Sequence, residues 1–210
     1  MNGEIRVWDP LLRIFHWSLV LAFSVAWLTG DEESRIHIWS GYTVLGLISF
    51  RVVWGLLGSR HARFTDFLRG PAAVGQYLRS LAGGRPQHYE GHNPAGGWMV
   101  LAMLFTLFVV TLSGLEVYAI EEGRGPFAGS TDTTPVTLAW IPTARADDDE
   151  DEGESGEDET AWEEIHEASA NFMLILVFLH ITGVLVSSRL HGENLVRAMI
   201  TGRKPRHDTR

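Results

Sequence analysis

The chain has 210 residues, the size of a single domain, and its apolar residues gather in four long runs. It contains no cysteine, which excludes disulfides, clusters held by thiolates and cofactors attached through C-x-x-C-H. The net charge of −9 comes from one segment, because residues 147–164 hold twelve acidic and no basic residues. The remainder of the chain is therefore slightly basic.

Four apolar runs, near residues 12–29, 37–57, 97–119 and 166–190, approach the ~20 residues that a helix needs to cross a membrane. None alternates as a strand does, and helices satisfy their own backbone groups in lipid. The first run lacks a small-x-small cleavage site after Trp27, so we interpret it as a retained span. The sequence predicts an all-α, integral membrane four-helix bundle formed by residues 1–210 as one domain.

Two connections differ in character. Between the second and third runs, apolar residues recur at helical spacing and predict a short amphipathic helix on the membrane surface: Phe64, Phe67, Leu68, Val74, Tyr77, Leu78 and Leu81. Between the third and fourth runs lies a loop of about residues 120–165. Its acidic part, residues 131–160, has too few apolar residues to form a core, and we expect it to be disordered.

Basic residues predict the orientation. Most lie at the two ends of the chain and in the second connection, whereas the opposite side has only Arg35, Arg124 and Arg145. By the positive-inside rule both termini are cytoplasmic and the acidic loop is outside. We expect a multi-pass protein of a bacterial inner membrane, in contact with lipid and not with nucleic acid.

Four of the nine histidines lie in or at the edge of the predicted spans: His16, His37, His166 and His180. His166 and His180 are fourteen residues apart, so one helix presents both on nearly the same face, about 21 Å apart along its axis. His37 opens its span at the outer surface, as His166 does, and His16 lies as deep as His180. Depth therefore sorts the four into an outer pair, His37 with His166, and an inner pair, His16 with His180.

Paired histidines on facing helices suit a haem used for electron transfer, because both axial positions of the iron are filled. A histidine that only holds helices together by a hydrogen bond is the alternative for each one alone. The match in depth favours the pairs, and it predicts two haems b held by His16, His37, His166 and His180.

Further candidate contacts of these two haems are Arg13, Arg35, Gly41 and Arg51. Arg51 stands fourteen residues after His37, level with the inner pair, while Arg13 and Arg35 flank His16 and His37. Arginine pairs well with haem propionates, although snorkelling to the membrane surface explains Arg13 and Arg51 equally well. Gly41, one turn after His37, would let a macrocycle approach the backbone. His92, just before the third run, is a candidate for protonation of a quinone.

Several motifs together resemble the bacterial cytochrome b561 and nickel–iron hydrogenase b-type cytochrome family. They are Val7-Trp8-Asp9-Pro10, Arg13-x-Phe15-His16-Trp17, His37 at the start of its span, Gly91-His92-Asn93-Pro94, and the pair His166 and His180. The resemblance implies two haems b, with the first and second spans each sharing one with the fourth. It also implies exchange of electrons between quinone and a periplasmic redox protein, such as a c-type cytochrome or a hydrogenase. The acidic insertion is not part of this pattern.

Three functions therefore remain open. The first is electron transfer between the quinone pool and a periplasmic partner, for which the acidic loop would attract a basic protein. The second is a superoxide:quinone oxidoreductase, which the resemblance also implies, although acidic charge would repel an anion. The third is a bundle without haem, such as a transporter. The acidic run has its own alternative, which is solvation in a salty habitat.

Overall fold

A computed structural model of the protein describes residues 3–30, 34–84, 87–128 and 154–205. Seven helices and two strands lie within these ranges. In chain order they are β1 (Glu4–Arg6), α1 (Pro10–Leu28), α2 (Arg35–Leu57), α3 (Phe64–Phe67), α4 (Pro71–Ala82), α5 (Pro94–Glu122), α6 (Glu154–His191), α7 (Leu195–Thr201) and β2 (Arg203–Pro205).

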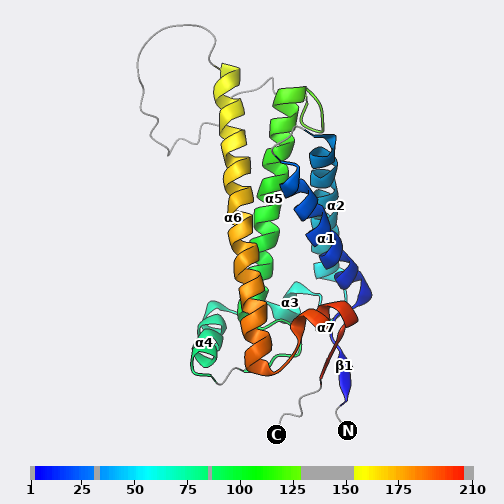
Figure 1. Ribbon diagram of the computed structural model, residues 1–210, viewed down its shortest axis with the longest axis vertical. Coiled ribbons are helices and arrows are strands. Elements are labelled where there is room, and N and C mark those ends of the chain that lie inside the picture. The colour runs from blue at the N-terminus through cyan, green and yellow to red at the C-terminus, as the bar shows by residue number, and fades with distance from the viewer. Residues whose placement is uncertain (1–2, 31–33, 85–86, 129–153, 206–210) are drawn as a thin grey trace.

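The four long helices, α1, α2, α5 and α6, run alternately up and down, and both chain ends lie at the same end of the bundle (Figure 1). We call this end the base, since it also holds α3, α4, α7 and the two strands, and we call the opposite end distal. Each long helix is long and apolar enough to span a membrane. The predicted all-α membrane bundle is confirmed. An even number of spans brings the first and last elements to the same end of the bundle, as observed.

Helix starts follow local chemistry. Asp9, Ser34 and Asn93 each cap a helix, since the side chain accepts a hydrogen bond from a backbone N–H three residues on. Proline at the first position of α1 and α5 suits a helix start, where its missing N–H costs nothing. These caps place the starts two or three residues before the predicted apolar runs.

The base is built from short elements that close the bundle. The predicted amphipathic helix is present as two pieces, because Pro71 begins α4 and separates it from α3. β1 pairs antiparallel with β2, with Ile5 opposite Lys204. The backbone N–H groups of Val7 and Trp8 both donate to the carbonyl of Gly202, whose φ of +80° suits glycine. The two ends of the chain therefore hold each other at the base.

Two clusters of buried apolar residues hold the helices together. One lies at the base (Val7, Trp8, Leu12, Phe15, Ala62 and Ala198) and the other halfway along the bundle (Ala22, Val44, Ile48, Leu107, Met173 and Leu176). Many large apolar side chains of α1, α2, α5 and α6 are exposed. Such an outer surface suits lipid.

The fourth long helix is longer than its apolar run. α6 begins at Glu154, so residues 154–160, which the sequence predicts to be disordered, are helical. Acidic residues are favourable in the first turns of a helix because its N-terminus carries partial positive charge. The rest of the predicted disordered segment, up to residue 153, lies outside the described residues.

Asp9 joins the start of α1 to the end of α2. One carboxylate oxygen accepts from the backbone N–H of Leu12 at 2.9 Å; the other accepts from the Ser59 hydroxyl at 2.5 Å and the Trp54 indole at 3.2 Å. Burial alone would raise the pKa of Asp9, but the hydrogen bonds from Ser59, Leu12 and Trp54 outweigh it and leave the pKa below its usual 3.8. This carboxylate therefore sets the angle at which α1 leaves the base.

Replacing Asp9 with alanine should lower the free energy of unfolding by about 1–3 kcal/mol, because one cap and two further hydrogen bonds are lost. Thermal unfolding of the detergent-solubilised protein measures the effect, with the exposed Glu90→Ala as control. Because the folded pKa is depressed, the difference between the native protein and Asp9→Ala should shrink as the pH falls through that pKa. Equal melting temperatures for the two variants would show that Asp9 does not fix the helices.

Candidate functional site

The structure brings the four histidines of the spans together in two pairs. The rings of His37 and His166 have centroids 6.0 Å apart, and we call them the distal pair. The rings of His16 and His180 have centroids 6.4 Å apart, and we call them the basal pair. The juxtaposition therefore follows the depth argument, whereas a role as metal ligands stays a prediction.

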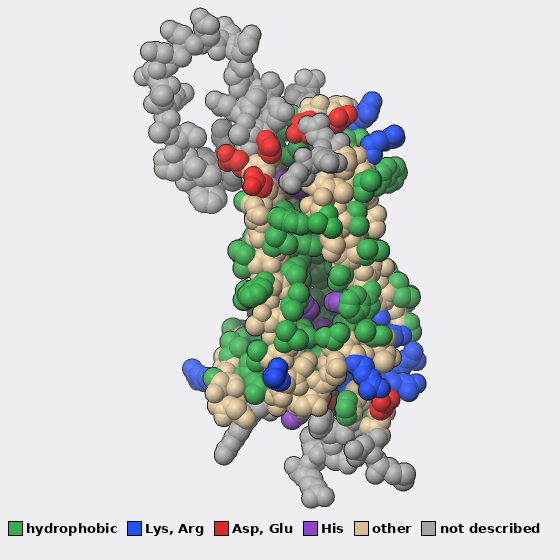
Figure 2. Space-filling view, viewed as in Figure 1, with side chains coloured by type: hydrophobic (Ala, Val, Ile, Leu, Met, Phe, Trp, Pro, Cys, Tyr) green, Lys and Arg blue, Asp and Glu red, His purple; other side chains and the backbone are tan. Residues whose placement is uncertain are grey.

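Both pairs bridge helices that otherwise stand apart. α6 packs along α5, and α1 packs along α2, but α6 has little backbone contact with α1 or α2. Figure 2 shows a hollow between α6 and α1, with histidine side chains at its floor. The histidine rings reach across this hollow, above and below the apolar cluster that lies halfway along the bundle.

The distal pair has a fixed orientation. Nδ1 of His37 lies 2.9 Å from the carbonyl oxygen of Ala26, and Nδ1 of His166 lies 2.9 Å from that of Val110. A carbonyl can only accept, so Nδ1 is the protonated nitrogen in both rings and Nε2 keeps a lone pair. Metal-binding histidines are commonly oriented in this way.

Gly114 of α5 makes room for the His166 ring. A Cβ atom at this position would lie 2.8 Å from Cε1 of His166 and 3.0 Å from its Nδ1. Such a contact is too close for any side chain, so only glycine lets the ring reach the carbonyl of Val110. The sequence gives no sign of this role, because glycine is common in membrane helices.

The base of the bundle holds an unusual buried cation. Arg51 of α2 is only 2% exposed, and neither of its Nη atoms has a hydrogen-bond partner among the described residues. Its guanidinium lies over the ring of Phe64 at 4.8 Å and near that of Phe67 at 5.8 Å. These cation–π contacts offset only part of the cost of burying an unpaired charge. Nδ1 of His16 is also buried without such a partner.

His92 lies between two aromatic rings at the base. Its ring centroid is 4.6 Å from that of Trp8 and 4.6 Å from that of Phe67, and its Nδ1 is buried without a partner among the described residues. Burial, together with the positive charges of Arg51 and Lys204, lowers the pKa of His92 to about 3. His92 is therefore neutral at physiological pH.

The other predicted contacts lie in different surroundings. Arg13 donates a hydrogen bond to the backbone carbonyl of Ile200, in α7, which is a structural contact at the base. A Cβ at Gly41 would meet nothing within 4 Å, so the space beside α2 is open there. Arg35 is exposed and lines a cavity of about 510 Å³ between α1 and α2.

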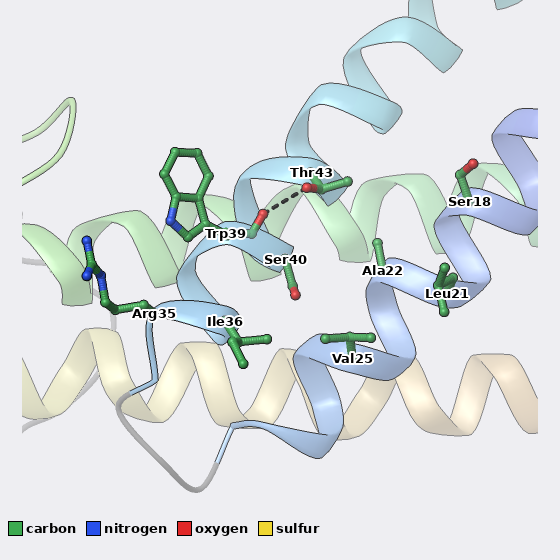
Figure 3. Close-up of a pocket in the computed structure, with 9 residues that line it drawn as sticks. All are labelled: Ser18, Leu21, Ala22, Val25, Arg35, Ile36, Trp39, Ser40 and Thr43. Carbon is green, nitrogen blue, oxygen red and sulfur yellow. Dashed lines mark hydrogen bonds between the residues drawn. The ribbon is translucent and has the colours of Figure 1, made fainter.

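This cavity is separate from the histidine pairs. Figure 3 shows Ile36 and Ser40 of α2 facing Ala22 and Val25 of α1 across it. None of the four histidines lines the cavity, and a contact of Arg35 with a haem stays a prediction.

Comparison with known families agrees with this geometry. The family model described as prokaryotic cytochrome b561 matches residues 7–202, nearly the whole chain. The chain belongs to the prokaryotic cytochrome b561 family. No curated protein and no solved structure gives a match. The protein is therefore a b-type membrane cytochrome that functions in electron transfer, and the family implies b-type haem.

The neutral state of His92 can be observed directly. In a protein with ¹⁵N-labelled histidine, the His92 imidazole, assigned by its loss in His92→Gln, should show no protonation between pH 8 and pH 5, since its pKa is about 3. A midpoint near 6.5 for this signal would contradict the enclosure described between Trp8 and Phe67.

Proposed function

We propose that this cytochrome b561 carries two haems b and transfers electrons between the quinone pool and a redox partner on the other side of the membrane. One observation carries the proposal. Two pairs of imidazole rings, with centroids 6.0 and 6.4 Å apart, face each other between helices that have little backbone contact. The family supports b-type haem, and the number of haems, the ligands and the partners are our inference.

The residues fit the group. A metal atom bonded to two imidazole nitrogens, at the about 2 Å typical of metal–histidine bonds, separates the ring centres by about 6 Å. His37 and His166 would hold one haem through Nε2, because their Nδ1 atoms face carbonyls. His16 and His180 would hold the other. The chain has no cysteine, so each would be bound without a thioether.

When bound, a haem with two histidine ligands supplies one-electron redox chemistry without an open position on the iron. The protein's own contribution is to fix the rings, exclude water from the gap and balance charge. A haem propionate would give the buried guanidinium of Arg51 the hydrogen-bonded anion that its two Nη atoms lack among the described residues. Arg13 and Arg35 have no part in this proposal. Arg13 donates to the carbonyl of Ile200, and Arg35 lines the cavity between α1 and α2.

The two ends of the bundle differ in charge. Figure 2 shows most of the acidic side chains at the distal end, next to a few basic ones, and most of the basic side chains at the base. Exposed acidic residues at the distal end include Glu122, Glu163, Glu164 and Glu167. By the positive-inside rule we place the base in the cytoplasm and the distal end in the periplasm. A basic redox protein, such as a c-type cytochrome, fits the distal end, and superoxide, an anion, fits it poorly.

The histidine pairs can be tested separately. His37→Ala or His166→Ala should remove one haem and leave the other, and His16→Ala or His180→Ala should remove the second, because each ligand pair serves one haem. A pyridine haemochrome assay should return two haems b per native chain and one per variant. Potentiometric titration of the spectrum should show the same remaining component for the two members of a pair.

Loss of the same component from His37→Ala and His180→Ala would contradict the pairing. One haem or none in the native chain would contradict the proposed function itself. Replacement of His61, which lies at the base outside both pairs, serves as the control and should leave both haems in place.

Replacing Arg51 with leucine should have opposite effects on the two forms of the protein. The haem-free chain should become more stable, since an unpaired buried charge is removed, and the loaded chain should lose the basal haem faster. Melting temperatures of both forms and the rate of haem transfer to apomyoglobin measure this, with the exposed Arg60→Leu as control. Unchanged haem loss in Arg51→Leu would exclude a propionate contact.

A further inference from the structure

The cavity between α1 and α2 has no role in the function proposed so far. Its volume of about 510 Å³ lies within the about 300–1,000 Å³ of typical small-molecule sites. Figure 3 shows Arg35 at one end of the cavity and Ser18 at the other. Arg35 is the first residue of α2, at the distal end, and Thr43 lines the cavity about 12 Å further along that helix. The cavity therefore runs from the distal end towards the middle of the bundle.

Most of the cavity wall is apolar. Leu21, Ala22 and Val25 line it on α1, and Ile36 and Trp39 line it on α2. Leu21, Ile36 and Trp39 are among the exposed large apolar side chains, so the cavity opens on the outer surface of the bundle. This surface faces hydrocarbon in a membrane. A molecule dissolved in the bilayer can therefore enter the cavity from the side.

The distal end of the cavity carries a positive charge. Arg35 is exposed, and no carboxylate among the described residues forms an ion pair with it. Trp39, one turn further along α2, is 69% exposed, and tryptophan is enriched at the level of the lipid headgroups. A guanidinium pairs with phosphate through two parallel N–H donors. A guanidinium at the headgroup level and an apolar groove below it match the two parts of a phospholipid.

We propose that one phospholipid, from the leaflet at the distal end, binds in this cavity. Its phosphate would pair with Arg35, and one of its acyl chains would lie between α1 and α2. The sequence just before Arg35 is acidic, with Asp31, Glu32 and Glu33, so a headgroup without net charge, such as phosphatidylethanolamine, suits it better than an anionic one. A quinone fits less well, because it has no charged group for the guanidinium.

The cavity lies beside the contact that orients His37. Val25 and Ile36 line the cavity, and the residues that follow them, Ala26 and His37, are joined by the 2.9 Å contact between the Ala26 carbonyl and Nδ1 of His37. An acyl chain that packs against both helices supplies dispersion contacts that an empty cavity lacks. The bound lipid would therefore help to hold α1 against α2 at the level of the distal pair.

Native mass spectrometry can measure this binding. The purified full chain is delipidated in detergent and titrated with phosphatidylethanolamine, and one lipid should bind more tightly than the others. Arg35→Gln should weaken this binding by about fivefold or more, because a charge-assisted pair with the phosphate is lost. Ser40→Leu should weaken it by about tenfold or more, because the larger side chain fills the cavity and leaves less apolar wall for the acyl chain.

Two matched variants and one matched lipid serve as controls. Arg124→Gln removes another exposed cation of the distal end, and Ser49→Leu adds the same bulk to an exposed position of α2 outside the cavity. Both should bind phosphatidylethanolamine as the native chain does. Diacylglycerol with the same acyl chains lacks the phosphate, so it should bind the native chain more weakly and Arg35→Gln no more weakly than the native chain.

Equal binding of phosphatidylethanolamine by the native chain, Arg35→Gln and Ser40→Leu overturns the lipid site. Equal binding of diacylglycerol and phosphatidylethanolamine by the native chain also overturns it, because the phosphate would then have no partner. Displacement of the lipid by an equal concentration of decylubiquinone would assign the cavity to a quinone instead. A dimer of the delipidated native chain that Ser40→Leu abolishes would assign it to a second copy of the chain, and either result contradicts the proposal.

Discussion

Lipid is as apolar as the helices, so no hydrophobic force brings helices together in a membrane. They associate instead through close van der Waals packing. In this protein α6 follows α5 along its length and has little backbone contact with α1 and α2. Two pairs of histidines cross the space on either side of the apolar cluster halfway along the bundle. A gap of this kind loses the dispersion contacts that close packing would give. We propose that haem fills this gap, held by the paired imidazoles.

The same reasoning accounts for the charged groups inside the base. The guanidinium of Arg51 is buried over the ring of Phe64, and the carboxylate of Glu193 is buried in an ion pair with Lys204. Charges in such places are costly unless they are paired, and they are usually kept for function. Neither Nη atom of Arg51 has a hydrogen-bond partner among the described residues, whereas Glu193 has an ammonium group 3.4 Å away.

Much of this arrangement can be predicted from sequence, because helix geometry is regular. The spacing from His166 to His180 and the depths of His16 and His37 suffice to predict which rings meet. Other features depend on contacts between residues far apart in sequence. The pairing of β1 with β2, the bonds from Trp54 and Ser59 to Asp9, and the room that Gly114 leaves for His166 have no local signal.

The most direct measurement of the central claim is an experimental density map of the pigmented protein, by crystallography or electron cryo-microscopy. The account predicts two macrocycles in the gap, one between His37 and His166 and one between His16 and His180, with a propionate next to Arg51. A map in which α6 closes against α1 and α2 without a ligand, or in which other residues bind the iron, would contradict it.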